Sequence, residues 1–255
     1  MDQNELDYIK IAYPPLDDLS FKIIVPRCPL VISQGLGNAW ATGRYSDPRG
    51  VMELDINENK NVAQIAADGP FAYRVPDKLL PNLRLSFGRL HPFSLYIKAG
   101  DISNHLDLGG IPLSAVEIQY GSGSQLINFS YPNPVEMQHL RIQADGGWVQ
   151  IKNIDYANAT DIHLKGPSTS YHLSLNALLK KDITLYTGMS ISKVEITLPT
   201  DTAVKVKSSV QPGSSIKDDF SRVDKEYCNT AAREEKSPCL CIHHVGPGPL
   251  KLSYF

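Results

Sequence analysis

Residues 95–129 read LYIKAGDISNHLDLGGIPLSAVEIQYGSGSQLINF and contain the same unit twice. In each copy, apolar and polar residues alternate over about five positions, the chain turns, and a second alternating run follows. The first copy spans 95–108 and the second spans 116–129. Alternation with a period of two predicts β-strands that bury one face, and the glycine-rich breaks predict the turns between them.

Three further copies of this unit follow along the chain. They begin at residues 140, 162 and 183, so the five starting points are separated by 21, 24, 22 and 21 residues. A nearly constant step of this size is typical of a β-solenoid, in which each repeat forms one coil. The predicted fold class is therefore all-β: a two-sheet, solenoid-like stack of strand–turn–strand coils. An antiparallel β-sandwich made of hairpins is the alternative that the same alternation permits.

The phase of the alternation assigns one row of side chains to the core. We expect the following residues to stack as this inward row: Ile97, Ile118, Ile142, Leu164 and Leu185. A single coil cannot bury its part of the row, so stacking at about 4.8 Å per coil must close the core. Glycines at 100, 121, 146 and 188 fall at the predicted turns, where a positive φ favours glycine.

The remainder of the chain divides by composition. We expect an irregular lead at residues 1–18, a small N-terminal β module at residues 19–82 and the repeating β-coil domain at residues 83–255. The proline-containing stretch 68–82 is the predicted joint, and we expect the two parts to form one continuous stack. The charged stretch 216–236 is the best helical candidate, but it has no continuous apolar stripe, so a loop with one helical turn is equally compatible with its sequence.

The charge balance limits the classes of partner. The 25 lysines and arginines and 27 aspartates and glutamates give a net charge of −2, so no nucleic-acid partner is predicted. No apolar run approaches the roughly 18 residues of a transmembrane segment. The first five residues are polar and acidic, unlike a secretory signal. We therefore expect a cytoplasmic protein whose four cysteines are reduced.

Cys239, Cys241 and His243 alternate near the C-terminal end of the sequence. On a strand they share one face, and thiolate and imidazole groups are ligands for zinc or copper(I). A fourth ligand would have to come from a neighbouring coil, so we favour an incidental grouping and expect no metal. Pro247 and Pro249 predict that this strand lies at an exposed edge, with both thiols open to reagents.

Catalytic motifs are missing from the sequence. It contains no G-x-x-x-x-G-K phosphate loop, no G-x-S-x-G elbow and no H-E-x-x-H zinc motif. The aspartates of the repeats lie mostly at turns, where the carboxylate serves the backbone. We therefore predict no catalytic residue, no cofactor and no enzymatic activity. A polysaccharide lyase would need several carboxylates on one face of neighbouring coils, and that class is disfavoured.

Aromatic residues recur near the strand–turn positions of successive coils. The candidate binding surface that they define is Tyr96, Tyr120, Trp148, Tyr171 and Tyr186. A row of rings on a flat sheet would suit a polysaccharide or a protein partner. Packing of the same rings in the corners of the fold is the alternative. His139 and His163 occupy similar phases of adjacent coils and are predicted to stack.

Several stretches resemble a known family of β-coil proteins. Leu30–Gly35, Thr42–Tyr45 and Met52–Ile56 resemble the N-terminal module of the LiaF-like, or DUF2154, "toast rack" family, which is related to DUF4097 proteins. Gly188–Val206 resembles the last coil of that family. Ala232–Leu252 resembles its closing step, although prolines surround Gly248.

The resemblance implies a binding role and supplies no catalytic residues. Many members of the family carry their coils beside membrane-spanning helices and act in cell-envelope stress sensing. We therefore expect a non-enzymatic binding, assembly or regulatory module of the toast-rack type. The alternative is an adhesin-like or carbohydrate-binding β-solenoid with a protein or polysaccharide as its partner.

Overall fold

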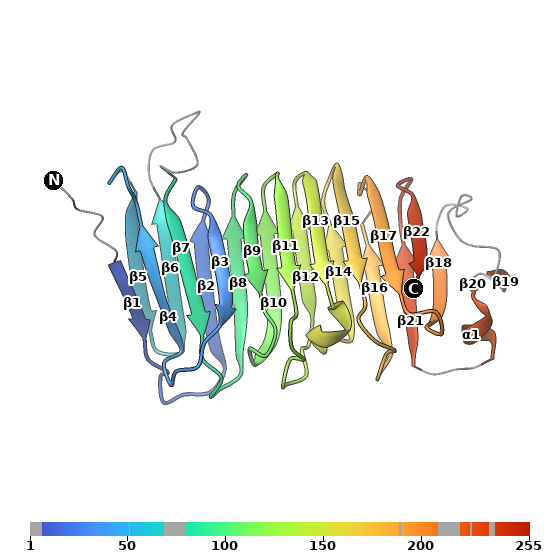
Figure 1. Ribbon diagram of the computed structural model, residues 1–255, viewed down its shortest axis with the longest axis horizontal. Helices are drawn as coiled ribbons and strands as arrows, with labels where there is room; N and C mark the ends of the chain where they lie inside the picture. The colour runs from blue at the N-terminus through green and yellow to red at the C-terminus, as the bar shows by residue number, and fades with distance from the viewer. Residues whose placement is uncertain are drawn as a thin grey trace.

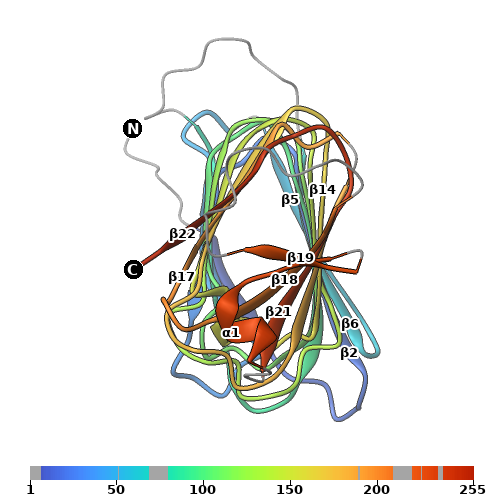
Figure 2. The same ribbon diagram turned by 90° about the vertical axis from the view of Figure 1, so that its right-hand side faces the viewer.

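The computed structural model describes residues 7–50, 52–68, 80–188, 190–208, 220–224, 226–234 and 238–255. In this part of the chain, 22 strands form a ten-stranded and a twelve-stranded sheet that face each other (Figures 1 and 2). Within the described residues, helix is confined to two single turns, η2 (Ile154–Ala157) and α1 (Thr230–Arg233). The prediction of an all-β fold with two sheets is confirmed.

Each sheet draws its strands from both ends and the middle of the chain. In spatial order, the ten-stranded sheet contains β1 (Asp7–Ile11), β4 (Ala41–Ser46), β7 (Asn82–Phe87), β3 (Leu30–Gln34), β9 (Asn104–Asp107), β11 (Ser124–Asn128), β13 (Gly147–Lys152), β15 (Thr169–Ser174), β17 (Lys193–Leu198) and β22 (Leu250–Tyr254). The twelve-stranded sheet contains β19 (Ser221–Val223), β20 (Glu226–Cys228), β18 (Ala203–Ser208), β21 (Cys239–His244), β16 (Ile183–Thr187), β14 (Asp161–Lys165), β12 (Leu140–Ala144), β10 (Leu113–Tyr120), β8 (Phe93–Ala99), β2 (Leu19–Val25), β6 (Val62–Asp68) and β5 (Glu53–Asn59).

Consecutive strands of the repeats alternate between the two sheets. Each strand pairs in parallel with the equivalent strand of the next repeat, as β8 does with β10 and β9 with β11. The offset between paired residues is the sequence repeat itself, because Ile118 lies beside Ile142 and Ile142 beside Leu164. Antiparallel hairpins, the alternative interpretation, are therefore wrong for residues 93–198.

The predicted inward row is right for four residues and wrong for Leu185. Ile97, Ile118, Ile142 and Leu164 stack in register and are buried, but Thr187 is the residue beside Leu164. Leu185 is also buried, one row away beside Ile162. The offset between β14 and β16 is 23 residues rather than the expected 21, because the connection before β16 is longer.

A buried polar pair continues the row beyond Leu164. The Thr187 hydroxyl lies 2.7 Å from His244 Nδ1, and His244 Nε2 lies 2.7 Å from the carbonyl oxygen of Gly248. Both side chains are buried, so these hydrogen bonds satisfy groups that would otherwise lose their contact with water.

The N-terminal end of the stack contains antiparallel strands. β1 pairs with β4, so residues 7–11 form an edge strand and the predicted irregular lead is wrong there. β2 pairs in parallel with both β6 and β8, and one apolar core runs from Ile9 to Leu252. Most of the predicted joint, residues 69–79, lies outside the described residues.

Strand order is not sequential at the C-terminal end. β21 lies between β16 and β18, although β18 precedes it in the chain. The predicted exposed edge at Cys239–His243 is therefore wrong, and the edge belongs to β22 beside β17. α1 agrees with the predicted helical turn, but β19 and β20 form an antiparallel pair where a loop was expected.

The glycines at the turns do not have the backbone conformation that the sequence predicted. Gly100, Gly121, Gly146 and Gly188 are not in the positive-φ region, whereas Gly147 has a φ of 84°. Gly147 also lies against the backbone of Gly123 one coil below, so a Cβ there would collide with it. A Cβ on Gly146 would make only an ordinary van der Waals contact, since its nearest neighbour, Ser122 Cβ, would be 3.7 Å away.

We expect Leu164→Asp to lower the free energy of unfolding by about 3–5 kcal/mol, because it places an unpaired charge in the core. The neighbouring Lys165 is exposed, so Lys165→Asp serves as the matched control and should change stability by less than about 1 kcal/mol. Chemical denaturation measures both. Equal effects of the two variants would contradict the assigned phase of β14.

Gly147→Ala should destabilise the protein by about 2 kcal/mol or more, because positive φ and the collision with Gly123 act together. Gly146→Ala, one residue earlier in the same turn, should change stability by no more than about 0.5 kcal/mol. Thermal unfolding of the two variants checks this. The reverse order would mean that Gly146, and not Gly147, is the residue on which the turn depends.

Candidate binding surface

The outward side chains of the twelve-stranded sheet form one continuous line. Successive pairs in the register join Lys22, Tyr96, Glu117, Arg141, His163, Tyr186, His243 and Lys207, which we call the outer ladder. Seven steps of about 4.8 Å give the ladder a length of about 34 Å. Residues far apart in the sequence thus form a narrow, flat stripe.

Aromatic rings in the middle of the outer ladder stack on one another. The ring centroids of His163 and Tyr186 are 4.6 Å apart at an interplanar angle of 12°, and those of Tyr186 and His243 are 5.0 Å apart at 31°. His163 therefore stacks on Tyr186 and not on His139, the predicted partner. Because the ring faces cover one another, a ligand would contact the ring edges, which carry the hydroxyl and imidazole groups.

The five aromatic residues predicted to form a surface do not lie together. Tyr96 and Tyr186 belong to the outer ladder, and Trp148 lies on the other sheet, 5.4 Å from the His172 ring. Tyr120 and Tyr171 are buried, so they are not part of any surface. Tyr171 donates a hydrogen bond of 2.6 Å to the Lys165 carbonyl, and burial raises its pKa. These two tyrosines share the inward phase of their strands.

The face that carries the outer ladder is basic. On β2 to β18 its outward cations are Lys22, Lys98, Arg141, Lys165, Lys205 and Lys207, and its outward carboxylates are Glu117 and Asp161. Six positive and two negative charges leave +4 on these eight strands, while β5 of the same sheet adds the exposed carboxylates Glu53 and Asp55. Among the described residues, none of the six cations has a carboxylate within 4.0 Å.

On the opposite sheet, one carboxylate contacts three basic side chains. Glu195 lies 2.8 Å from His172, 2.7 Å from Lys193 and 3.5 Å from Lys251. The hydrogen bond from Lys193 lowers the pKa of Glu195 most, and burial opposes it. Among the described residues, Lys10, Arg44, Arg84 and Lys152 of the same sheet are exposed and have no carboxylate within 4.0 Å, so both faces present unpaired cations.

A notch lies between the outer ladder and the next outward row. Its volume is about 70 Å³, and its polar lining is Glu117, Gln119, Arg141, Gln143, His163 and Lys165. The Gln119 amide donates a hydrogen bond of 3.2 Å to Glu117. Burial, and then the Arg141 guanidinium, lower the pKa of His163, so its imidazole is neutral near pH 7.

A larger hollow lies at the corners of three neighbouring coils. Its volume is about 260 Å³, and its walls include Pro132, Leu178, Leu179 and Ile183. Of the described residues that line it, Asp155 is the one carboxylate; burial raises its pKa, and it accepts a hydrogen bond of 2.8 Å from the Asn176 N–H. A carboxylate that serves the backbone is a poor acid–base catalyst without a second group.

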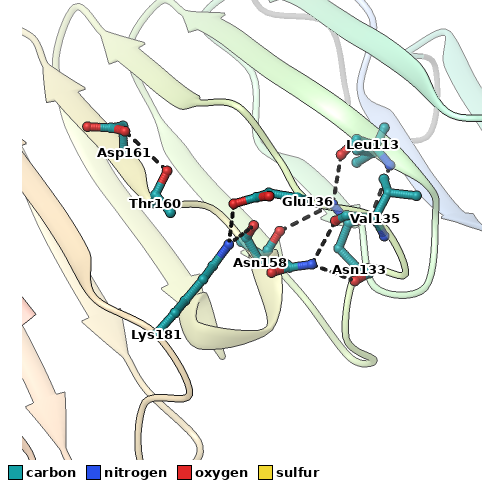
Figure 3. Close-up of polar contacts among 9 residues, drawn as sticks. Leu113, Asn133, Val135, Glu136, Asn158, Thr160, Asp161 and Lys181 are labelled. Atoms are coloured by element: carbon teal, nitrogen blue, oxygen red, sulfur yellow. Dashed lines mark hydrogen bonds and ion pairs between the residues drawn. The ribbon is translucent and has the colours of Figure 1, made fainter. Parts of the chain in front are cut away.

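Polar side chains beside this hollow hold the corners together (Figure 3). Asn133 donates hydrogen bonds to the carbonyls of Leu113 and Ala157, at 2.8 and 3.2 Å, and so joins the coils before and after its own. Lys181 lies 2.9 Å from the Asn158 carbonyl and 3.3 Å from Glu136. These side chains stabilise the corners of the fold, a role that the sequence alone did not indicate.

Cys239, Cys241 and His243 share the outer face of β21, as alternation predicted, but they do not converge. Cys239 is buried in a small cluster with Ala231 and Ala232 of α1, and burial, followed by the nearby Cys241 thiol, raises its pKa to about 12. Cys241 lies between Thr184 and Lys205, so a lysine occupies the place of a further ligand. The part of the chain that the structure describes contains no group of three metal-ligating side chains.

Solved structures of very low sequence identity are similar to this chain along its length. A candidate cell adhesion protein from Clostridium sporogenes ATCC 15579 matches 99% of this chain and 99% of its own, with a TM-score of 0.50 and 11% identity. A candidate adhesin from Bacteroides fragilis NCTC 9343 matches 97% of this chain and 95% of its own, with a TM-score of 0.45 and 10% identity. At this identity the first likeness shows the fold alone.

No protein-family model matches the chain, and no curated protein matches its sequence. Within the described residues, no helix has the length and apolar character needed to cross a membrane.

A mild thiol reagent should modify Cys241 first, because Cys239 is buried and burial holds its pKa at about 12. We expect Cys239 to react at least about tenfold more slowly than Cys241. Intact-mass analysis of the native protein over time, with Cys241→Ser as the control, separates the two sites. Equal rates at Cys239 and Cys241 would contradict the packing of α1 over β21.

Proposed function

We propose that this chain is a non-enzymatic binding module, built as a two-sheet β-solenoid of the toast-rack type. The nearly constant offset between parallel strands, 21 to 24 residues from β8 to β16, supports the solenoid part of the proposal. The observation that carries the function is the outer ladder, a straight line of polar, aromatic and basic side chains supplied by eight strands. A flat stripe of this length suits an extended partner better than a small substrate, which needs a concave site.

The chemistry of the described ionisable groups supports a binding role over catalysis. Asp101, Asp107 and Asp155 each accept hydrogen bonds from backbone N–H groups, at 2.6, 3.1 and 2.8 Å. Their carboxylates therefore stabilise turns, and they are separated along the stack instead of paired. Catalysis of polysaccharide cleavage would require such groups to converge on one bond.

Adhesion is the use of the module that we propose first. The candidate cell adhesion protein from Clostridium sporogenes has the same fold along its whole length, and an unbroken face for a polymer fits such a role. The alternative is a cytoplasmic or envelope-linked regulatory module, as the toast-rack resemblance implies. Fractionation of the producing cells distinguishes the two, since an adhesin must be exposed outside the cell.

The proposal predicts that an immobilised extended polymer retains the protein through the outer ladder. A panel of neutral glucan, acidic polyuronate, peptidoglycan and a fibrous protein is the probe set. The double variant His163→Ala, Tyr186→Ala removes two stacked rings and should lose at least about tenfold in affinity for any polymer retained.

The matched control is the double variant His105→Ala, Gln150→Ala, which removes two outward side chains of equivalent phase on the opposite sheet. It should bind as tightly as the unmodified protein does. Neither double variant should change the unfolding temperature. Retention by no member of the panel, or equal losses in both double variants, would count against the outer ladder as the binding surface.

A further inference from the structure

The hollow at the corners of three coils combines apolar walls with a few charged side chains. Pro132, Leu178, Leu179 and Ile183 supply apolar surface, and Leu178 is 53% exposed. Concave sites of this composition are the usual form of a small-molecule site. None of the residues that line the hollow belongs to the outer ladder, so the two are separate features of the molecule.

Three charged residues line the hollow, and one of them is committed to the fold. Lys181 donates a hydrogen bond of 2.9 Å to the Asn158 carbonyl and lies 3.3 Å from the Glu136 carboxylate (Figure 3). Its charge is therefore paired, and its position is fixed by the corner that it stabilises. The other two charged residues are Asp155 and Lys180, and these are the groups from which a ligand can be inferred.

Asp155 has a carboxylate that the backbone holds in place without using all of its acceptor capacity. The Asn176 N–H donates a hydrogen bond of 2.8 Å to Asp155 Oδ1, whereas a carboxylate offers about four acceptor sites. Burial raises the pKa of Asp155, which means that its charged form has lost part of its contact with water. An ammonium group bound in the hollow would replace that lost solvation with a charge-assisted hydrogen bond.

Lys180 is exposed, and its ammonium group is near Asp155 without contacting it. Among the described residues, no carboxylate lies within 4.0 Å of the Lys180 ammonium. Lys180 nevertheless lowers the pKa of Asp155, after the larger effects of burial and of backbone hydrogen bonds. A gap between two interacting opposite charges fits a ligand that carries both charges close together, as an α-amino acid does on a single carbon atom.

Charge balance and size both restrict the ligand further. Lys180 balances Asp155, and Glu136 balances Lys181, so a ligand without net charge fits the hollow best. An anion would be repelled by Asp155, and a cation would be repelled by Lys180. The volume of about 260 Å³ holds roughly nine water-sized groups. This is close to the size of leucine and too small for a peptide of several residues.

We propose that the hollow binds a free apolar α-amino acid of about the size of leucine. The ammonium group of the ligand pairs with Asp155, its carboxylate pairs with Lys180, and its side chain packs against Leu179 and Ile183. This second site goes beyond the proposed function, because the outer ladder takes no part in it.

L-Leucine is the probe, and isothermal titration calorimetry with the intact protein measures its affinity. We expect saturable binding of one leucine per chain. N-acetyl-leucine lacks the ammonium charge and leucinamide lacks the carboxylate, so each should bind at least about tenfold more weakly than leucine. Glycine has both charges but no side chain for the apolar wall, and it should also bind at least about tenfold more weakly.

Variants of the two charged residues test the assigned contacts. Asp155→Asn keeps an acceptor for the Asn176 N–H but removes the charge, and it should lower the affinity for leucine at least about tenfold. Lys180→Gln should do the same at an exposed position, without a change in unfolding temperature, and it decides the matter if Asp155→Asn also destabilises the corner. The matched controls are Asp107→Asn, at another corner carboxylate that accepts a backbone N–H bond, and Lys152→Gln, at another exposed lysine. Neither lines the hollow, so each should change the affinity less than about twofold.

Three outcomes would overturn the inference. The first is no saturable binding of leucine at concentrations up to about 10 mM. The second is equal affinity for leucine, N-acetyl-leucine and leucinamide, which would show that the apolar wall alone binds them. The third is a loss in the control variants as large as that in Asp155→Asn and Lys180→Gln, which would place the site elsewhere. None of these outcomes bears on retention of a polymer through the outer ladder, so failure here leaves the proposed function standing.

Discussion

Parallel pairing between strands one repeat apart is the constraint on which the rest of this structure depends. Because side chains alternate with a period of two, an in-register ladder gives every strand of a sheet the same inward and outward phase. The pairing that places Ile118 beside Ile142 therefore also places Glu117 beside Arg141. The same register fixes which side chains are buried and which are exposed, and a slip of one residue would exchange the two sets.

The sequence permits good prediction of the coils, because their repeats are nearly constant and their alternation is regular. Prediction fails where a connection changes length, as it does before Leu185. It also fails where the inward or outward phase of a residue was not counted along its strand. Tyr120 lies two residues after the buried Ile118, so counting in twos would have placed it in the core. The outer ladder follows from the same counting, since Tyr96 and Tyr186 have the opposite phase.

The ends of the stack could not be predicted in the same way, because their strands follow no repeat. β1 pairs antiparallel with β4, and β5 forms a hairpin with β6. The outermost strand β5 is exposed at six of its seven residues and carries Glu53, Asp55 and Glu58. Charged residues on an edge strand discourage pairing with a second sheet, so this end resists uncontrolled growth of the stack.

The position of β21 has a consequence for how the chain reaches its folded state. Coils that add in sequence order need only local contacts with the coil before them, and such steps are fast. β18 cannot join in that order, because its neighbour β21 comes later in the chain and must lie between it and β16. β18 therefore gains its parallel neighbour only after β21 has paired with β16. Closure of this end is a long-range step, and the Cys228 and Cys239 thiols become buried only when it is complete.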